Sequence, residues 1–332
     1  MQSIKTLLAA CLIAAGTSAQ AVDLERSDIA DFVDTLVRED GLERSAVEAA
    51  LADAKVRQDI IERMQKPAEK RLIWGEYRDI FLTDKRIDAG VNFWDEHAAT
   101  VAAVSDDTGV PPEILLGIIG VETYYGRITG KDRVIDALVT LGFDYPPRAA
   151  FFRKELRKFF ELATRERIDI GTALGSYAGA MGRAQFIASS YLAYAVDTDG
   201  DGRRDLFNSW PDVVGSVANY FVSHRWKPGS TVVVPATLAP NHTVNLPERQ
   251  GRKTNTTVAE LRAAGVSFDA ELPASAPALL IAFEGKVGPE YYVGLHNFYV
   301  ITEYNHSAMY AMAVWQLGNA IAEQRASRLA AR

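Results

Sequence analysis

Apolar residues recur with helical spacing along most of this 332-residue chain, and one internal stretch breaks the pattern. Over residues 27–97, positions such as Ile29, Phe32 and Leu36 repeat every three or four residues, which predicts helices with one apolar face. Between residues 229 and 302 the sequence pattern changes to short runs of strand-forming residues, separated by Pro, Gly and Asn. Helical spacing then returns up to the C-terminus. This order predicts a mainly α protein (α+β) with a small inserted β-rich subdomain.

Within the insertion three runs are expected as strands, namely residues 231–234, 278–283 and 298–301. Thr257 and Glu260 have the capping-box spacing that begins a helix, and Ser45 and Glu48 have it in the N-terminal part. The predicted organisation is a signal peptide (1–21), an N-terminal helical domain (22–105), a helical core (106–228), the β-rich subdomain (229–302) and a C-terminal helix that returns to the core (303–332).

The first 21 residues have the layout of a secretory signal peptide. Lys5 precedes an apolar run over residues 7–15, and small residues lead to Ala21, after which we expect cleavage. Cys11 is the only cysteine, so cleavage leaves a chain without disulfides or thiol chemistry. The alternative is that Cys11 is acylated and anchors the protein to a membrane. Cleavage predicts a soluble periplasmic protein, which we expect to be a monomer.

Composition and charge narrow the classes of function. The chain is 48% hydrophobic and 24% charged, as expected of a globular protein with a sizeable core. Removing residues 1–21 loses one lysine and no acid, which leaves 35 basic against 43 acidic residues and a net charge of −8. This acidic balance disfavours nucleic acid as a partner. The five histidines show no HExxH spacing, and there is no GxSxG, GxGxxG or phosphate loop, so zinc proteases, serine hydrolases and nucleotide enzymes find no support.

Glu122 is the strongest candidate for a catalytic group. A proline pair begins a helix expected to run from Ile114 to Tyr125, and apolar residues three, four, seven and eight positions earlier place the Glu122 carboxyl on the apolar face. Apolar surroundings and the negative end of the helix dipole disfavour the charged form, so we expect a raised pKa and a role as proton donor. The alternative is a buried structural glutamate paired with Arg127 or Arg133.

The stretch GSYAGAMGRAQFIASSY, residues 175–191, is rich in small residues that let a backbone or a ligand approach closely. Ser176 and Gln185 add polar groups, which favours a ligand site. Close packing of the backbone would explain the small residues equally well.

The segment ITEYNHSAMYAMAVWQLG, residues 301–318, has aromatic rings and amides that suit sugar binding through stacking and hydrogen bonds, Tyr304 and Asn305 among them. The alternative is a helix cap followed by a core stripe to which Tyr310 and Trp315 belong.

Alternating aspartates begin the segment DTDGDG, residues 197–202, with carboxylates at loop positions 1, 3 and 5 and a glycine at position 6. This is the first half of an EF-hand-like calcium loop. Position 12 is Asn208 rather than glutamate, so Asp212 is the candidate for the closing carboxylate. A bound calcium ion would stabilise the loop rather than take part in catalysis, and the alternative is a solvated acidic turn.

Four segments in sequence order resemble the membrane-bound lytic murein transglycosylase B family: GIIGVETYYG (117–126), GSYAGAMG (175–182), DTDGDG (197–202) and YNHSAMYAMAVWQLG (304–318). The resemblance spans roughly residues 74–318. It implies a lysozyme-like helical catalytic core with an N-terminal helical domain and a small β domain, which agrees with the organisation predicted above. It also implies peptidoglycan glycan strands as the substrate and allows partners in the cell-wall synthesis machinery.

The resemblance implies that Glu122 protonates the glycosidic oxygen between N-acetylmuramic acid and N-acetylglucosamine and then takes the proton from the 6-hydroxyl of the muramic acid. That hydroxyl attacks its own anomeric carbon and leaves a 1,6-anhydromuramic end, so the outcome is that of a lyase. Ordinary glycosidases need two carboxylates. No second acid stands out in the four segments beyond the loop aspartates, and an intramolecular nucleophile makes one dispensable.

By the same resemblance, the substrate-binding residues are expected to be Ser176, Gln185, Tyr304, Asn305, Tyr77, Tyr220 and Tyr310. The expected calcium ligands are Asp197, Asp199, Asp201, the carbonyl of Arg203, and Asp212, which closes the loop one residue later than in the family's form. No catalytic cofactor is implied. Two rival functions remain, a hydrolytic muramidase and a non-catalytic peptidoglycan-binding scaffold. The chemistry of the product distinguishes a hydrolytic muramidase from a lytic transglycosylase. The presence of Glu122 argues against a non-catalytic scaffold.

Overall fold

The computed structural model describes residues 20–66, 72–246 and 250–331. The helices are α1 (Ser27–Asp40), α2 (Arg44–Asp53), α3 (Gln58–Gln65), α4 (Trp74–Phe81), α5 (Asp84–Glu96), α6 (Ala98–Thr108), α7 (Pro112–Thr123), α8 (Val134–Asp144), α9 (Ala149–Glu166), α10 (Ala188–Tyr194), α11 (Trp210–Ser223), α12 (Val258–Ala263), α13 (His296–Tyr304) and α14 (Ala308–Ala330). The strands are β1 (Gln20–Ala21), β2 (Lys55–Val56), β3 (Asp132–Arg133), β4 (Leu174–Gly175), β5 (Val233–Leu238), β6 (Thr256–Thr257), β7 (Val266–Ser267), β8 (Pro277–Glu284) and β9 (Pro289–Gly294). A mainly α fold with a small inserted sheet is thereby confirmed.

Most of the predicted signal peptide, including Lys5 and Cys11, lies outside the described residues. Its last two positions form β1, which pairs with β2 in antiparallel register, Gln20 opposite Val56. Among the described residues, no helix has the length and apolar character needed to cross a membrane.

Helix α7 lies at the centre of the core. The prediction gave this helix one apolar face, but residues 114–120 are all buried, because α5, α6, α11 and α14 pack around it. Its most extensive contact is with α14. The two helices approach closely because a Cβ at Gly117 would overlap the carbonyl oxygen of Val314, and a Cβ at Gly318 would overlap that of Glu113. These glycines of the GIIG and WQLG segments therefore serve helix packing.

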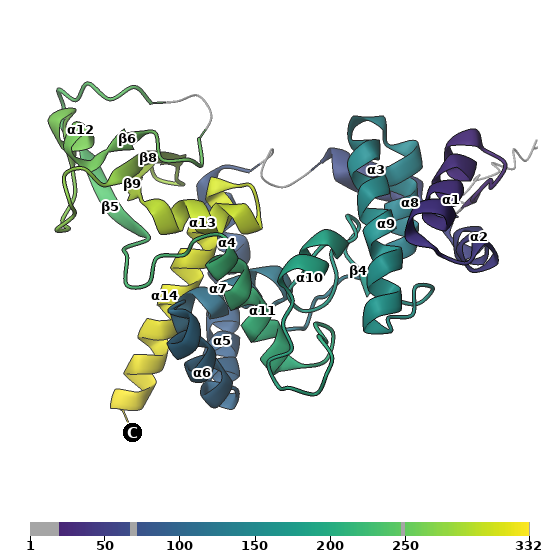
Figure 1. The fold of residues 1–332 in the computed structure, drawn as a ribbon. Coiled ribbons are helices and arrows are strands. Elements are labelled where there is room, and N and C mark those ends of the chain that lie inside the picture. Colours follow the sequence, from purple (N-terminus) through teal and green to yellow (C-terminus); the bar gives the residue numbers. More distant parts are fainter. Residues whose placement is uncertain (1–19, 67–71, 247–249, 332) are drawn as a thin grey trace, which may run out of the picture.

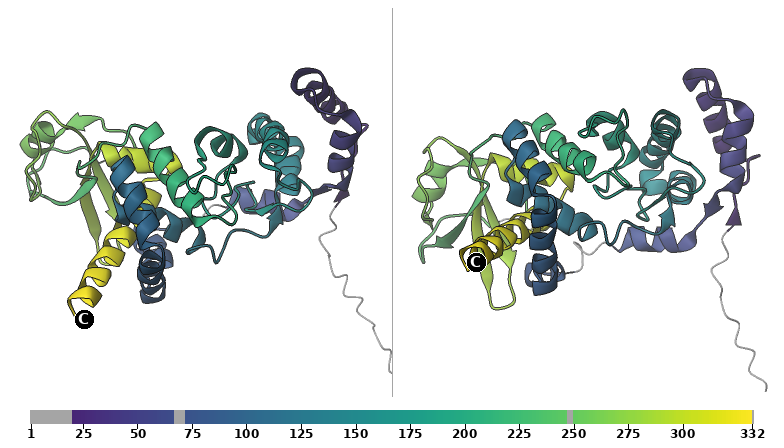
Figure 2. Two further views of the ribbon diagram at one scale, coloured as in Figure 1. Left: turned by 60° about the horizontal axis from the view of Figure 1, so that its bottom comes forward. Right: turned by 90° about the horizontal axis from the view of Figure 1, so that it is seen from below.

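The N-terminal helices divide between the two ends of an elongated molecule (Figures 1 and 2). Helices α1 to α3 lie with α8 and α9 at one end, where α3 packs on α8. Helices α4 to α6 lie toward the end that carries the small sheet, where α4 and α5 pack on α14 and α6 packs on α11. Residues 22–105, which were predicted to form one N-terminal helical domain, therefore contribute to two separate packing arrangements.

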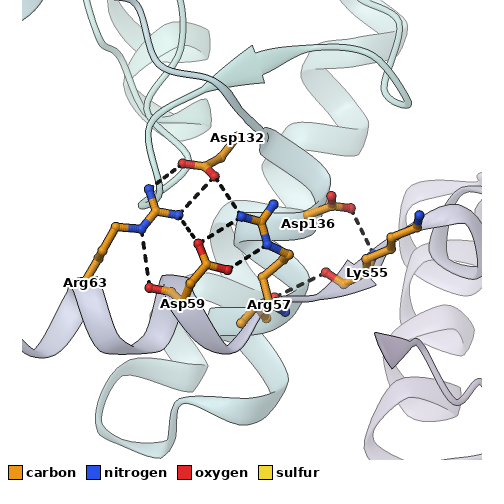
Figure 3. Close-up of polar contacts among 7 residues, drawn as sticks. Lys55, Arg57, Asp59, Arg63, Asp132 and Asp136 are labelled. Atoms are coloured by element: carbon orange, nitrogen blue, oxygen red, sulfur yellow. Dashed lines mark hydrogen bonds and ion pairs between the residues drawn. The ribbon is translucent and has the colours of Figure 1, made fainter. Parts of the chain in front are cut away.

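A cluster of ion pairs fastens α3 to β3 (Figure 3). Asp132, only 3% exposed, accepts hydrogen bonds from both terminal nitrogens of Arg63 at 2.8 and 3.0 Å. Asp59 accepts from Arg57 at 2.7 Å and from Arg63 at 2.8 Å. The hydrogen bond from Arg57 holds the pKa of Asp59 below its usual value. Because Asp132 is buried, removing Arg63 would leave its charge with only the longer contact to Arg57 at 3.6 Å, which is costly.

The inserted sheet has five antiparallel strands in the order β6-β8-β9-β5-β7. Its register sets Val293 of β9 opposite both Leu280 of β8 and Val234 of β5. One face of the sheet and helix α12 enclose a second, smaller core, made of Val234, Val258, Leu261, Val266, Ala278, Leu280, Val293 and Leu295. The subdomain therefore has a hydrophobic core of its own.

Two of the three predicted strands are found and the third is wrong. Residues 278–283 lie in β8, and residues 231–234 overlap the start of β5. Residues 298–301 belong instead to α13, where Phe298, Val300 and Ile301 are buried. A short apolar run that is buried in this way shows neither helical nor strand periodicity, so its composition alone could not decide between them.

The two predicted capping boxes have different outcomes. Thr257 and Glu260 form one at the start of α12, which confirms the prediction. Ser45 is not the cap, because α2 begins at Arg44, two residues earlier than a cap at Ser45 would allow. The carboxylate of Glu43 caps the helix and accepts the hydrogen bond from the backbone N–H of Ala46 at 2.8 Å. An acidic side chain can cap a helix as a hydroxyl does.

Candidate active site

A groove of about 630 Å³ brings together side chains from widely separated parts of the chain. Six of the predicted catalytic and substrate-binding residues line it, namely Glu122, Ser176, Gln185, Tyr220, Tyr304 and Asn305. The other two, Tyr77 and Tyr310, are buried in the core, 3% and 2% exposed. Predicted residues that lie far apart in the sequence therefore converge on one site.

A left-handed turn that begins two residues after Glu122 ends helix α7. Helix α7 stops at Thr123, earlier than predicted, because Tyr124, Tyr125 and Gly126 have φ values of 51°, 57° and 79°. The left-handed conformation costs each of the two tyrosines roughly 1–2 kcal/mol. The hydroxyl of Thr123 accepts a hydrogen bond from the backbone N–H of Gly126 at 3.1 Å and so closes the turn. Glu122 is thus held in the last turn of a buried helix, where it borders the groove.

Arg86 of α5 holds this turn in place. Its guanidinium donates to the carbonyl of Gly120 in the last turn of α7 at 2.9 Å and lies 4.6 Å from the ring centre of Tyr124. Arg127 lies over the same ring at 4.7 Å, and Arg133 is ion-paired with Asp53. Both arginines considered as structural partners of Glu122 are therefore engaged elsewhere.

Tyr310 contacts the carboxylate of Glu122 from below the groove. Its hydroxyl donates a hydrogen bond to Glu122 Oε1. Burial, and next the charge of Glu122, raise the pKa of Tyr310 well above its ordinary value, so the hydroxyl keeps its proton and remains a donor. Tyr77 makes the smallest contribution to the same pKa shift. Tyr310 is therefore a core residue, as the alternative interpretation of residues 301–318 proposed, and it is also a hydrogen-bond partner of the candidate acid Glu122.

Tyr304 and Tyr220 form the aromatic side of the groove, with ring centres 4.8 Å apart. The hydroxyl of Tyr304 donates to the carbonyl of Ala184 at 2.7 Å, and that of Tyr220 donates to the carbonyl of Glu303 at 2.7 Å. Burial and the charge of Glu122 raise the pKa of Tyr304. Asn305 follows at the exposed end of α13. These rings are fixed by their hydroxyls and offer a rigid surface to a ligand.

The opposite wall is the loop rich in small residues. The hydroxyl of Ser176 accepts hydrogen bonds from two backbone N–H groups of its own loop, at 3.1 and 3.3 Å. The amide of Gln185 donates to the carbonyls of Thr129 and Gly182 at 3.0 and 2.9 Å. A Cβ at Gly175 would overlap the carbonyl oxygen of Ala180. The small residues thus allow close backbone packing, which was the alternative interpretation of residues 175–191. The packed loop also forms a wall of the groove.

Several lining residues were not predicted. Arg148, Phe151 and Tyr177 extend the groove, and Glu303 adds a second carboxylate next to the last of the four segments. Glu303 is ion-paired with Arg252 at 3.0 Å. Nothing in the local pattern of Glu303 distinguishes it from a solvated helix residue, so only the fold could place it in the groove.

The acidic loop gathers three carboxylates. Oxygens of Asp197, Asp199 and Asp212 lie within 4.8 Å of one another. Asp212 is fully buried, burial raises its pKa, and it accepts from the backbone N–H of Thr198 at 2.7 Å. The candidate closing carboxylate is therefore beside the first two. Asp201 instead accepts from the backbone N–H of Arg203 at 2.8 Å. Hard oxygen donors of this kind suit a calcium ion.

Known proteins match this chain over nearly its whole length. The transglycosylase SLT domain family matches residues 25–319. Membrane-bound lytic murein transglycosylase B of Escherichia coli (strain K12) is 41% identical over 303 residues, which are 89% of this chain and 82% of that protein. The structure of soluble lytic transglycosylase SltB1 from Pseudomonas aeruginosa is 45% identical with a TM-score of 0.82, covering 90% of this chain and 99% of that one. The Escherichia coli lytic transglycosylase SLT35 in complex with calcium is 41% identical with a TM-score of 0.84, covering 93% and 97%.

The fold that the resemblance implied is confirmed by these structures, and three of the four segments that carried the resemblance contribute residues to one groove. The chain therefore belongs to the transglycosylase SLT domain family of peptidoglycan-degrading enzymes, in the lytic murein transglycosylase B group.

Proposed function

We propose that the protein cleaves the β-1,4 bond between N-acetylmuramic acid and N-acetylglucosamine in peptidoglycan without consuming water, leaving 1,6-anhydromuramic ends. The observation that carries the proposal is the Glu122 carboxyl, which borders the groove and accepts a hydrogen bond from the buried Tyr310 hydroxyl. Pseudomonas aeruginosa SltB3, 26% identical over 88% of this chain with a TM-score of 0.73, has been solved in complex with NAG-anhNAM-pentapeptide. That complex supports a glycan strand as the ligand of this groove.

Glu122 carries out both proton transfers in this proposal. Its protonated carboxyl donates a proton to the glycosidic oxygen as the bond to the anomeric carbon breaks. The carboxylate then accepts the proton of the muramic acid 6-hydroxyl as that oxygen bonds to the same carbon. One proton is given and one is taken, so the enzyme returns to its starting state.

Tyr310 assists the first transfer. A hydrogen bond donated to a carboxylate stabilises the charged form. Because the hydroxyl of Tyr310 keeps its proton, it can donate to Glu122 throughout the reaction. The Tyr310 hydroxyl would therefore stabilise the carboxylate that forms as Glu122 passes its proton to the leaving oxygen.

The products of purified peptidoglycan test the proposal. Mass analysis should find muramic acid ends lighter by one water than the reducing ends that hydrolysis produces. Reducing ends would support the hydrolytic muramidase and direct attention to Glu303 as the second carboxylate. Intact glycan strands bound without cleavage would support the scaffold.

We also propose that the acidic loop binds a structural calcium ion through Asp197, Asp199 and Asp212, with Asp201 and the Arg203 carbonyl nearby in the loop. The proximity of the first three carboxylates and the burial of Asp212 support a bound cation, and the related SLT35 is known in complex with calcium. No part of the proposed chemistry passes through this ion.

Calcium removal should lower the melting temperature of the wild type. A ligand that binds only the folded state stabilises it, and a chelator removes that contribution. The variant Asp199→Ala lacks one of the carboxylates, so its melting temperature should be lower at the outset and unchanged by the chelator. Calorimetry with and without chelator checks this, and identical wild-type melting curves would remove calcium from the account.

We propose that residues 1–21 direct export to the periplasm and are cleaved near Ala21, with acylation of Cys11 as the alternative. The apolar run and the small residues at the expected cleavage site support this. The intact mass of protein recovered from the periplasm or from membranes distinguishes a cleaved chain from a lipid-bearing one.

A further inference from the structure

We propose that Tyr177 is a sugar-stacking platform in the wall of the groove, and that Arg63, which lies outside the groove lining, is the residue that positions it. The inference rests on the proposed function, because it takes a glycan strand to be the ligand. It adds a binding residue to those that the resemblance implies, and it gives α3 a part in substrate binding.

Tyr177 borders the groove, and its ring lies against a cation from helix α3. The guanidinium carbon of Arg63 lies 5.3 Å from the centre of the Tyr177 ring. Tyr177 lines the same groove as Glu122. The arginine therefore covers part of the ring, and the ring borders the space where a glycan strand would lie.

Arg63 is itself held rigidly (Figure 3). Its two terminal nitrogens bond to the buried carboxylate of Asp132 at 2.8 and 3.0 Å, and one of them also bonds to Asp59 at 2.8 Å. A planar guanidinium fixed by two carboxylates can move little, so the ring against it is restrained as well. A free tyrosine would have to lose rotational freedom on binding, whereas this one has already lost it.

The backbone ties the two ends of this contact into one unit. Asp132 of β3 lies opposite Gly175 of β4, and Tyr177 follows two residues later. The turn that carries Tyr177 is closed by a hydrogen bond from the N–H of Ser176 to the carbonyl of Ala180 at 2.8 Å. Arg63 therefore bonds to one strand of the pair and stacks on the residue that emerges from the other. Helix α3 sets the position of the groove wall through a single side chain.

The chemistry favours a neutral sugar ring as the ligand of Tyr177. The charge of Arg63 is balanced by two aspartates, so the cluster does not offer a free cation to an acidic group. The face of a pyranose presents C–H bonds that pack against an aromatic ring. The cation behind the ring is satisfied by its own partners and acts as a support.

Binding can be measured apart from catalysis in the Glu122→Gln background, by calorimetry with purified uncleaved glycan strands. Adding Tyr177→Ala should raise the dissociation constant by about tenfold, as expected for the loss of one stacking contact. Adding Arg63→Lys retains a charge for Asp132 but removes the flat surface and the paired hydrogen bonds, so it should weaken binding severalfold. With both changes present, the dissociation constant should equal that of the Tyr177→Ala protein, because Arg63 acts only through the ring.

Arg157→Lys is the matched control. Arg157 of α9 forms ion pairs with Glu39 and Asp40 of α1 at 3.0 and 2.7 Å, at the same end of the molecule, and it is not among the described residues that line the groove. Its replacement should leave glycan affinity unchanged. Melting temperatures of all variants separate loss of binding from loss of fold.

Two results would overturn the inference. Unchanged affinity in a folded Tyr177→Ala protein would show that the ring is no platform. A double variant that binds more weakly than Tyr177→Ala alone would show that Arg63 acts by another route. Neither result bears on the anhydro ends that test the proposed function, so a failure of this inference can be told apart from a failure of that proposal.

Discussion

Replacement of Glu122 by glutamine is expected to lower kcat by roughly a thousandfold, within the range typical for removing a general acid and base. The amide has nearly the shape of the carboxyl and can accept the hydrogen bond from Tyr310, so folding and glycan binding should persist. The rate of release of muropeptides from purified peptidoglycan, with the melting temperature measured alongside, checks both parts. Near-normal turnover would remove the acid/base role from Glu122.

Glu303→Gln is the matched control, because it makes the same chemical change in the same groove. Glu303 is already ion-paired with Arg252, and a mechanism with one carboxylate gives it no proton to transfer. Turnover should therefore stay close to that of the wild type. A loss as large as that of Glu122→Gln would instead indicate a pair of catalytic carboxylates and the hydrolytic alternative.

Replacement of Gly318 by alanine is expected to lower the free energy of unfolding by about 3 kcal/mol, at the upper end of the usual cost of overpacking a core. Alanine in place of glycine normally stabilises a helix by about 0.5–1 kcal/mol, so the expected sign is reversed. The reason is that the added Cβ would overlap the backbone carbonyl of Glu113, and neither α7 nor α14 can yield without opening the core. Urea unfolding followed by circular dichroism measures the change.

Gly288→Ala provides the comparison, because a Cβ at Gly288 would meet nothing within 4 Å. Its free energy of unfolding should match that of the wild type. If Gly318→Ala were equally stable, the close approach of α7 and α14 would be wrong. If the variant folds but is less stable, kcat should also fall, because α7 carries Glu122 in its last turn and α14 carries Tyr310.

The sequence predicted the local elements best where the pattern was long or the chemistry specific. The proline pair, the apolar helix and the glutamate near its end placed Glu122 correctly on α7, and the alternating aspartates marked the acidic loop. Prediction failed where several signals compete over a few residues. The run 298–301 is as apolar as a strand but is buried within α13, and Glu43 rather than Ser45 caps α2.

Much of the candidate site also followed from sequence, through the resemblance of four segments to one family. The sequence could not show which contacts each of these site residues makes in the folded protein. The Ser176 hydroxyl accepts hydrogen bonds from its own loop, and the Gln185 amide donates to the carbonyls of Thr129 and Gly182. Tyr310 reaches the groove only through Glu122. Glu303 and Tyr177 went unnoticed because neither lies at a distinctive spacing.

The sequence by itself determined the order of helices and strands, the insertion of the sheet, and the types of side chain available for catalysis, because periodicity and turn chemistry act over a few residues. Only the tertiary structure decided that the N-terminal helices separate toward two ends, that Tyr310 meets Glu122 across 188 positions, and that Arg63 meets Asp132 across 69. Such contacts depend on how whole helices pack, and packing depends on the shapes of many side chains at once. No local pattern in the chain encodes them separately.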